Sequence, residues 1–558
     1  MKRFLWLGSV LSLYLICSGC GDTFRPIIIP TPPVFPNPQA AHTVLAVSDN
    51  AALPGQPEET PGTAMVIDVS GDTEVSISNV GLAPVHAVQQ SASEVLVVNH
   101  SVTGAVADSI SKLNYNGTVI GNTNTISLPA NSAPTFAAVA PNQTTAYVTL
   151  PNYLPPAGTG LVPSVGVVNT LTNAAGPFIQ VGNNPVALAV TPDNTKLFVA
   201  NELDSTISGF NTKDDSTRVS SPVATSSAPI WLVARNDNQR VYALEEGTGV
   251  LAELDTTSTA GPDTLTEYPG SYSVAGATAM VYDGNLNRLY IPGGSVTKII
   301  DVSGTPAVVL ATITMPSFPL LNLPPATATA AAVAALPDGS RAYVGSYATL
   351  PSQLTIASVS GDGTTATYAY SLTAGQVLNP GLTLTVSGTG IGFDGAMVVS
   401  AIVSGTSTCP GTCFEASNAT SGSWPPAGTT GAATGAGSNI FPQVSVVNVS
   451  TNSISTTIAM PGFPDATDPS TPQFYVAACV APTPPIPYRA TFRFMMAAGG
   501  DSTRAYLSSC DGGMVNIINT ATDSYILSMA APVGTRPNPA GAQLQNLPQS
   551  PVFLIAGP

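Results

Sequence analysis

The chain has 558 residues, more than the ~100 to 200 of one ordinary domain, so it must hold several domains or one large repeat structure. Charged residues make up only 9% of it, against roughly 25% in an average soluble protein, whereas glycine (50) and proline (51) are abundant. This composition favours a turn-rich β protein. Acidic residues outnumber basic ones by 32 to 16, and the net charge of -16 repels phosphate backbones, which argues against nucleic acid as a partner.

The first 20 residues have the pattern of an export signal. Lys2 and Arg3 precede an apolar run, residues 4–16, which is too short to span a bilayer of ~30 Å as a helix. Ser18 and Gly19 then stand directly before Cys20. This arrangement resembles the lipobox of bacterial lipoproteins, which implies a signal peptide over residues 1–19 and lipidation of Cys20, palmitate included. A plain secretory signal cleaved nearby is the alternative.

A proline-rich segment follows Cys20. Prolines stand at positions 26, 30, 32, 33, 36 and 38, and each fixes φ and removes an amide donor. We therefore expect residues 20–42 to form the lipidated cysteine and an extended stalk. The lipid would then be the link between the protein and a membrane of the bacterial cell envelope. The sequence leaves open whether this is the outer membrane, the cell surface or the periplasmic face.

One pattern recurs along the rest of the chain. It consists of a proline, an apolar strand, a turn, a second strand with an aromatic–Val pair, and a third strand that ends in Asn or Asp. The clearest copy begins at Pro185, has its pair at Phe198 and Val199, and ends its third strand at Asn211. The central apolar residues of seven further copies lie at positions 45, 97, 147, 242, 290, 343 and 506. The spacing is typical of four-stranded propeller blades.

The copies resemble the YVTN β-propeller repeat of about forty residues. Tyr147-Val148-Thr149 and Phe198-Val199-Ala200-Asn201 come closest to it, and the resemblance covers residues 43–558. It implies an all-β propeller. The eight copies predict eight four-stranded blades, with seven as a close alternative and an array of two-sheet sandwiches as the competing fold. The first copy lacks an innermost strand, and residues 550–556 could supply it and close the ring.

One interval breaks the repeat. Tyr343 and Tyr506 are 163 residues apart, whereas the preceding intervals between aromatic residues are 44 to 53 residues long. We expect an inserted small β module over residues 355–437, with strands at 367–372, 382–386 and 396–402 and a Gly/Ala/Thr-rich return at 427–437. Insertions at a hairpin tip leave a fold intact and often carry specific contacts, although an insertion without a ligand is as reasonable an expectation.

Four cysteines remain after export, Cys409, Cys413, Cys479 and Cys510. An even number in an oxidising compartment favours two disulfides. Cys409 and Cys413 flank a Pro-Gly turn and predict a local bridge, which leaves Cys479 to pair with Cys510. A redox pair or metal site is the alternative, but the chain has no haem-attachment motif and no histidine near these thiols.

The remaining residues that could carry chemistry are few. His42, His86 and His100 are too few and too scattered for a multi-histidine metal centre, and we expect surface or turn positions for them. Residues 390–395 match Gly-x-Gly-x-x-Gly, but the predicted strand at 396–402 follows them. A helix N-terminus that could hold a pyrophosphate is therefore not expected there.

Three groups of carboxylates stand close together in the sequence. They are Asp214 with Asp215, Glu245 with Glu246, and Asp465 with Asp468. They could bind calcium weakly, yet none has the pattern of a known calcium loop, and solvated loop charge is the favoured interpretation. We therefore predict no catalytic residue, no cofactor and no dedicated metal ligand.

These observations favour a non-enzymatic envelope protein that acts as a scaffold or binds a protein or glycan. Propellers also include lactonases and quinoprotein-type dehydrogenases, whose sites gather at the central channel, and a structural part in an envelope assembly is a third hypothesis. Converging acidic groups in the channel would favour an enzyme. Apolar filling of the channel would favour a scaffold.

Overall fold

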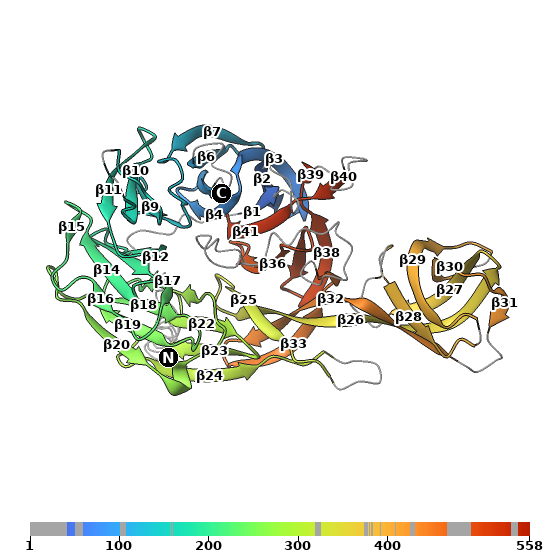
Figure 1. Cartoon of the computed structure of the whole chain (residues 1–558). Coiled ribbons are helices and arrows are strands. Elements are labelled where there is room, and N and C mark those ends of the chain that lie inside the picture. The colour runs from blue at the N-terminus through green and yellow to red at the C-terminus, as the bar shows by residue number, and fades with distance from the viewer. Residues whose placement is uncertain are drawn as a thin grey trace, which may run out of the picture. The chain divides into compact units, whose positions relative to one another are not determined.

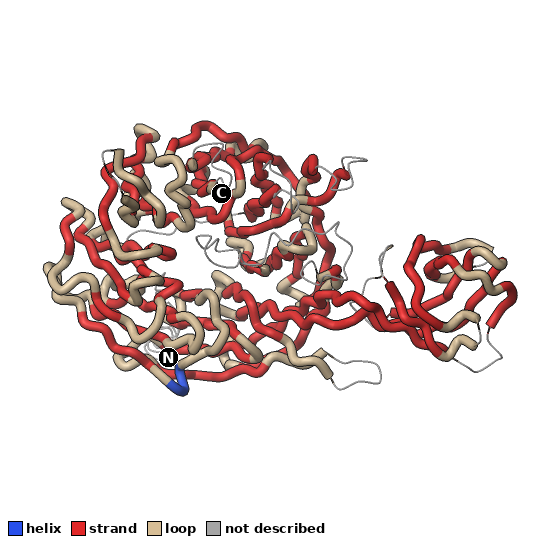
Figure 2. The backbone as a smooth tube through the Cα atoms, in the orientation of Figure 1, coloured by secondary structure: helices blue, strands red, loops and turns tan. Residues whose placement is uncertain are grey.

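The computed structural model describes residues 42–50, 60–100, 108–156, 158, 160–318, 325–372, 378, 380, 383–390, 392–407, 409–424, 430–465, 493–536 and 545–557. Strands dominate this part of the chain, and η1 (Gly270–Tyr272), a single 3-10 turn, is the one helical element described (Figure 2). None of the described helical residues forms a helix long and apolar enough to cross a membrane. Contacts divide the chain into Met1–Asn37, which lies outside the described residues, and Pro38–Pro558.

Eight four-stranded antiparallel blades form a β-propeller (Figure 1), which confirms the predicted fold and the larger of the two blade numbers. The first four blades are given from the innermost strand outward. Blade 1 contains β41 (Ser550–Ala556), β1 (Thr43–Asn50), β2 (Thr60–Asp68) and β3 (Thr73–Leu82), and blade 2 contains β4 (Pro84–Gln89), β5 (Glu94–Asn99), β6 (Ser109–Tyr115) and β7 (Ile120–Ser127). Blade 3 contains β8 (Ala137–Val139), β9 (Thr145–Leu150), β10 (Ser164–Asn169) and β11 (Ala174–Gln180), and blade 4 contains β12 (Pro185–Val190), β13 (Lys196–Asn201), β14 (Thr206–Asn211) and the short β15 (Ser216–Thr217) and β16 (Val223–Ala224).

The other four blades continue in chain order. Blade 5 contains β17 (Pro229–Ala234), β18 (Arg240–Glu245), β19 (Leu251–Asp255) and β20 (Thr264–Tyr268), and blade 6 contains β21 (Val281–Asp283), β22 (Arg288–Gly293), β23 (Val296–Asp301) and β24 (Val308–Thr314). Blade 7 contains β25 (Thr329–Ala335), parts of β26 (Arg341–Asp362) and β32 (Gly431–Asn448), β33 (Ser453–Ala459) and the short β34 (Phe463–Pro464). Blade 8 contains β35 (Phe494–Ala498), β36 (Arg504–Ser509), β37 (Met514–Asn519) and β38 (Ser524–Ala530), and β39 (Val533–Arg536) and β40 (Gln545–Pro548) form a separate hairpin.

The two ends of the propeller sequence meet in blade 1. β41 pairs antiparallel with β1, from Val44 opposite Ala556 to Asp49 opposite Ser550. All eight residues of β1 are buried, because β41 and β2 pair with its two edges while blades 2 and 8 pack against its two faces. The innermost strand that the first repeat lacks is therefore the strand expected over residues 550–556.

The insertion in blade 7 is a closed barrel. β26 and β32 pair inside the blade and stay paired beyond it, as far as Ile356 opposite Gly431. There β27 (Thr365–Leu372), β28 (Thr383–Ser387), β29 (Gly395–Ser404) and β30 (Thr412–Ser417) join their outer edges. The pairing order β26-β27-β30-β29-β28-β32 returns to β26, so six strands close on themselves, and β31 (Ser421–Trp424) pairs with the far end of β26. From Gly431 onward the Gly/Ala/Thr-rich segment forms the first part of strand β32, whereas the sequence predicted a return segment there and no strand.

The barrel has its own core, separate from the ring. Tyr368 and Phe414 stack with ring centroids 4.6 Å apart, and Leu384, Val386 and Val399 are buried with them. Cys409 and Cys413 form the predicted local disulfide, with a Cα–Cα distance of 6.0 Å. Cys510 is buried and disulfide-bonded. Cys479 lies outside the described residues, so its pairing with Cys510 stays a prediction.

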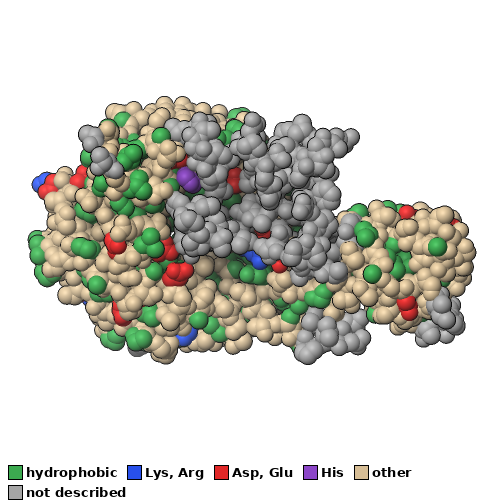
Figure 3. All heavy atoms as spheres, viewed as in Figure 1, with side chains coloured by type: hydrophobic (Ala, Val, Ile, Leu, Met, Phe, Trp, Pro, Cys, Tyr) green, Lys and Arg blue, Asp and Glu red, His purple; other side chains and the backbone are tan. Residues whose placement is uncertain are grey.

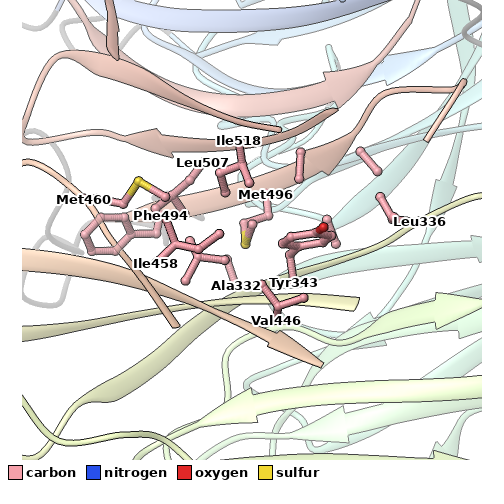
Figure 4. Packing of buried hydrophobic residues seen from close by; sticks show 14 of the residues in the cluster. Ala332, Leu336, Tyr343, Val446, Ile458, Met460, Phe494, Met496, Leu507 and Ile518 are labelled. Carbon is pink, nitrogen blue, oxygen red and sulfur yellow. The ribbon is translucent and has the colours of Figure 1, made fainter. Parts of the chain in front are cut away.

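Neighbouring blades bury their apolar faces against each other. Between blades 7 and 8, Tyr343 and Val446 pack against Met496, Leu507 and Ile518 (Figure 4). The aromatic residue of the repeat lies in such an interface in each of six blades. These residues are Tyr147, Phe198, Tyr242, Tyr290, Tyr343 and Tyr506, all less than 3% exposed.

A basic residue joins each of six blades to the next. In five blades it is the first residue of the second strand, and it reaches the turn after the third strand of the following blade. The five contacts are Lys196 Nζ to Thr256 O, Arg240 Nη2 to Thr305 Oγ1 (3.4 Å), Arg288 Nη1 to Val449 O (2.9 Å), Arg341 Nη1 to Thr520 O, and Arg504 Nε to Asp72 Oδ1 (2.7 Å). In blade 2, Lys112 Nζ donates to Thr170 O of blade 3 at 3.1 Å.

The Asn or Asp that ends the third strand of the repeat caps the turn after it. Asn169 Oδ1 accepts from the N–H groups of Leu171 and Thr172, both at 3.0 Å. Asn448 and Asn519 make the same pair of bonds in blades 7 and 8. Side chains that bond to the backbone two and three residues ahead favour such turns, which explains why the repeat requires Asn or Asp here.

We predict that Leu554→Ala in β41 lowers the free energy of unfolding by about 2 to 5 kcal/mol, as for other buried leucines. Leu554 is 2% exposed and packs against blade 8 residues, so it supports the closing strand directly. Val533→Ala is the control because Val533 is 59% exposed, and its effect should stay within about 0.5 kcal/mol. The measurement is the urea midpoint of the two variants. Equal shifts would contradict a stabilising role for the closing strand.

Candidate functional site

Apolar side chains from the innermost strands of several blades meet near the centre of the ring. Trp231 of β17, Ala279 and Met495 of β35 pack against the cluster that contains Phe553 of β41, although they belong to blades 5, 6, 8 and 1. Trp231 also lies edge-on to Phe136, with centroids 5.6 Å apart. Phe136, directly before β8 of blade 3, and Trp231 of blade 5 are therefore in contact although their blades are not neighbours.

Irregularities at the start of the innermost strands set the direction of these side chains. The strands of blades 2, 4 and 5 begin at a proline, and the strand register shifts directly after it, between Pro84 and His86, Pro185 and Ala187, and Pro229 and Trp231. Proline is tolerated at the first residue of a strand, and a bulge redirects the side chain that follows. The prolines can be seen in the sequence. The bulge that follows each of them can be seen only in the strand pairing of the structure.

His86 is part of this aromatic group. Its ring centroid lies 4.0 Å from that of Phe136 and 4.5 Å from that of Phe553, and the side chain is 4% exposed. Burial lowers the pKa of His86 to about 3, so the imidazole is neutral in the folded protein. The prediction of a surface or turn position was wrong for His86, because the bulge turns it inward.

His100 is buried too, which corrects the same prediction. Its Nδ1 lies 3.2 Å from Asp108 Oδ1, and Asp108 also accepts from Ser132 Oγ and from the Ala133 N–H. In this order the aspartate stands between the serine and the histidine, so the histidine does not reach the serine as a general base would. His42 is exposed, as expected.

The second strands of all blades run in the same direction, so their ends lie on one face of the ring, which we call the upper face. Between blades 4 and 5 this face carries Glu202 after β13, Glu245 and Glu246 at the end of β18, and Glu267 on β20. Glu202 is 4% exposed and Glu245 is fully buried, whereas Glu246 is exposed. We call these four residues the glutamate cluster.

Hydrogen bonds hold three of the four carboxylates in place. Ser226 Oγ and the Ser227 N–H donate to Glu245 Oε2 at 2.7 and 2.8 Å, and the Ser226 N–H donates to Glu267 Oε1 at 2.6 Å. The one serine therefore bridges two carboxylates. Asn184 Nδ2 donates to Glu202 Oε2.

Burial disfavours the charged state of these glutamates. It raises the pKa of Glu202 to about 7, with a further contribution from the negative charge of Glu246. It also raises the pKa of Glu245 to about 6, and the neighbouring Glu267 adds to the effect. The interpretation of Glu245 as solvated loop charge was therefore wrong, because Ser226 and the strand end keep it from water.

The other residues that the sequence singled out differ in their surroundings. Asp214 is exposed, as loop charge should be, and Asp465 is buried in an ion pair with Arg493 at 2.7 Å, which corrects that interpretation. Asp468 and Cys20 lie outside the described residues. After Gly395 the chain continues as strand β29, as predicted. Within the described ranges, no three His, Cys, Asp or Glu side chains come together as metal ligands would.

No family model and no curated protein matches the chain. Among solved structures, apo AztD from Citrobacter koseri is 9% identical with a TM-score of 0.46, covering 92% of this chain and 97% of its own. A protein of unknown function from Desulfotomaculum acetoxidans DSM 771 is 12% identical with a TM-score of 0.42, covering 55% and 89%. Kuenenia stuttgartiensis hydrazine synthase is 15% identical with a TM-score of 0.35, covering 48% and 76%.

We predict that wild-type protein loses stability as the pH rises from about 5 to about 8. The folded protein holds the Glu202 proton up to a pKa of about 7, whereas the unfolded chain releases it near 4.5. The stabilisation that the bound proton gives is fully present below pH 4.5 and is lost as the pH rises through 7. The free energy of unfolding should fall by an amount on the order of 2 kcal/mol between pH 5 and pH 8.

Thermal unfolding at pH 5 and pH 8 measures the effect. In Glu202→Gln the difference between the two pH values should shrink, while Glu74→Gln, which changes an exposed glutamate, should leave it unchanged. An unchanged difference in Glu202→Gln would show that Glu202 does not carry this proton.

Proposed function

We propose that this chain is a bacterial envelope lipoprotein whose propeller binds a protein or glycan partner and does not transform it. The observation that carries the proposal is that the innermost strands bring the rings of His86, Phe136, Trp231 and Phe553, from four blades, into contact with one another. Propeller enzymes would need polar groups to converge at that place around a substrate. Apolar side chains in mutual contact leave a rigid disc that presents loops and edges instead.

The barrel inserted in blade 7 supports a binding role. Its core residues belong to one cluster, whereas the part of β26 and β32 inside blade 7 packs in another with blade 8. A unit that has its own core and stands at the tip of two paired strands can bind a partner, and adjust to it, without disturbing the ring. Function on such scaffolds is commonly carried by the inserted segments.

The proposed anchor is the lipidated Cys20, followed by the proline-rich stalk of residues 20–42. Two or three acyl chains hold a protein on a membrane stably, and an extended stalk would keep the disc away from the headgroups. The net charge of -16 agrees with this, because an acidic disc is repelled by anionic lipids.

We predict that a photo-cross-linking amino acid at Val398, on β29 of the barrel, yields a discrete adduct with an envelope protein or glycan in cells that produce the full chain. Val308, on β24 at the outer edge of blade 6, is the matched control because both valines are 53% exposed. The adduct should be absent with the probe at Val308. No adduct at Val398, together with lactone hydrolysis or quinone-dependent alcohol oxidation by the purified chain, would replace this proposal by the enzyme hypothesis.

We further predict that Cys20→Ala moves the protein from the membrane fraction to the soluble fraction and abolishes incorporation of labelled palmitate. Cys17→Ala is the matched control and should leave both unchanged, because Cys17 would be removed with the signal peptide. Labelling that persists in Cys20→Ala would place the lipid elsewhere.

A further inference from the structure

The barrel inserted in blade 7 is almost without charge. The sequence contains no lysine or arginine between Arg341 and Arg489. Over residues 354–434 its carboxylates are Asp362, Asp394 and Glu415. On the face drawn in Figure 3, the barrel at the right shows few red side chains and no blue ones. The barrel therefore offers no cation to a phosphate, sulfate or carboxylate group, and little negative charge to a basic peptide.

The described surface of the barrel is also poor in apolar side chains. Among its described residues, Val398 is the one large hydrophobic side chain that is mostly exposed, at 53%. Stable protein–protein interfaces cover about 800 Å² on each partner and have an apolar centre. One valine and three carboxylates do not supply such a surface. A neutral ligand that needs only a small contact area fits the barrel better.

Trp424 is the feature of the barrel that suits such a ligand. It ends strand β31 and lies opposite Val359 in the pairing with β26. Part of the indole packs against the barrel core, and the rest is exposed. No described residue accepts a hydrogen bond from the indole N–H, and this nitrogen is not among the buried atoms without a partner. The donor is therefore open to a ligand and stands beside exposed aromatic surface.

Glycines keep the surroundings of the indole open. Gly422 lies on the same side of β31 as Trp424, and a Cβ added there would meet nothing within 4 Å. Gly390 is exposed, and a Cβ added there would lie 3.3 Å from Trp424 Cδ1 and 3.7 Å from its Nε1. The φ of Gly390 is +92°, a conformation that favours glycine. The backbone at Gly390 therefore comes close to the indole edge without a side chain that would cover it.

Hydrogen bonds fix the backbone on both sides of Gly390. On one side, Asp394 Oδ1 accepts from the N–H and the hydroxyl of Thr389 at 2.7 and 2.6 Å. On the other, Asn418 Nδ2 and Thr420 Oγ1 donate to the carbonyl of Gly392 at 3.0 and 2.8 Å. A site whose parts are held in place before binding loses little conformational entropy when a ligand arrives.

We infer that the indole site, which consists of Trp424, Gly390, Gly392 and Gly422, binds an uncharged saccharide of an envelope glycan. The inference rests on the proposed binding function and makes the partner of the barrel a glycan rather than a protein. A pyranose ring has an apolar face of C–H groups, which can stack on an indole. It also has a rim of hydroxyl groups, which can accept from the indole N–H and bond to nearby backbone groups. Such a ligand carries no charge, in keeping with the barrel around the site.

The test measures retardation of the full chain, in a neutral detergent, in native gels that each contain one soluble polysaccharide. Dextran, mannan, galactan and glycol chitin supply neutral sugars, and polygalacturonate supplies an acidic one. Trp424→Ala removes the stacking surface, and Trp424→Phe keeps a ring but removes the N–H. Tyr370→Ala is the matched control, because Tyr370 is also a partly exposed aromatic side chain packed against the barrel core. Thermal unfolding of each variant checks that the fold persists.

We expect at least one neutral polysaccharide to retard wild type. Trp424→Ala should raise the dissociation constant roughly tenfold or more, Trp424→Phe should raise it less, and Tyr370→Ala should change it less than about threefold. Retardation by none of the neutral polysaccharides would overturn the inference. Equal losses in Trp424→Ala and Tyr370→Ala would overturn it as well, because they would show a general effect on the barrel. Retardation by polygalacturonate alone would contradict an uncharged ligand.

Failure of this inference is distinguishable from failure of the proposed function. The cross-linking experiment at Val398 detects a protein as well as a glycan and does not use Trp424. A protein adduct at Val398 without retardation would leave the binding function in place and make the partner of the barrel a protein. The absence of both adduct and retardation would count against the binding function itself.

Discussion

The pairing of β41 with β1 is the constraint on which the rest of the molecule depends. Each blade has two apolar faces, and a row of blades would leave one face bare at each end. The pairing joins strands about 500 residues apart in the sequence, and it places blade 1 between blades 2 and 8. Once the ring is closed, every blade has two neighbours, and the buried aromatic residues of the repeat have a surface to pack against.

Charge is used sparingly, and several of the basic residues lie at the junctions between blades. Lys196, Arg240, Arg288, Arg341 and Arg504 reach from one blade to the next, and these five are a substantial part of the 16 basic residues in the chain. Several of their acceptors are backbone carbonyls at fixed turns. A long cationic side chain can bridge a junction in this way without the loss of apolar contact between the blades. The low charged content of the sequence thus reflects a structure held mainly by stacked apolar faces.

On the upper face between blades 4 and 5, two buried glutamates have no described basic residue in an ion pair with them. At the ends of β13 and β18 the strands place Glu202 and Glu245 in buried positions, and the charge that acts on Glu202 is that of Glu246. Protonation relieves part of the cost at low pH, and a cation would relieve it at neutral pH. The same two blades also contain the buried ion pair of Arg218 with Asp263. The lack of a described cation beside the glutamates is therefore confined to this part of the upper face and does not hold for the whole of blades 4 and 5.

Much of the fold could be predicted from the sequence, because the repeat depends on local physics. Asn169, Asn448 and Asn519 accept hydrogen bonds from backbone groups two or three residues ahead, so these turns depend only on nearby sequence. Alternating apolar residues likewise favour strands through local preferences. Eight blades, with seven as a close alternative, closure by residues 550–556, the inserted module and the local disulfide were all expected from the sequence. The basic residue before the aromatic pair was visible in five copies, but its role was not recognised.

The candidate site could not be predicted in the same way, since it depends on what non-local neighbours bury. The sequence showed Glu245–Glu246 only as two charges in a loop, and His86 as one histidine among three. The register shift after Pro84 turns His86 toward Phe136 and Phe553, and the strand ends of blades 4 and 5 bring Glu202 to Asn184 and Glu267 to Ser226. By itself the sequence determined the blades, through local turn and strand preferences. Only the tertiary structure decided which polar side chains lose water, because burial is set by blades that are distant in the chain.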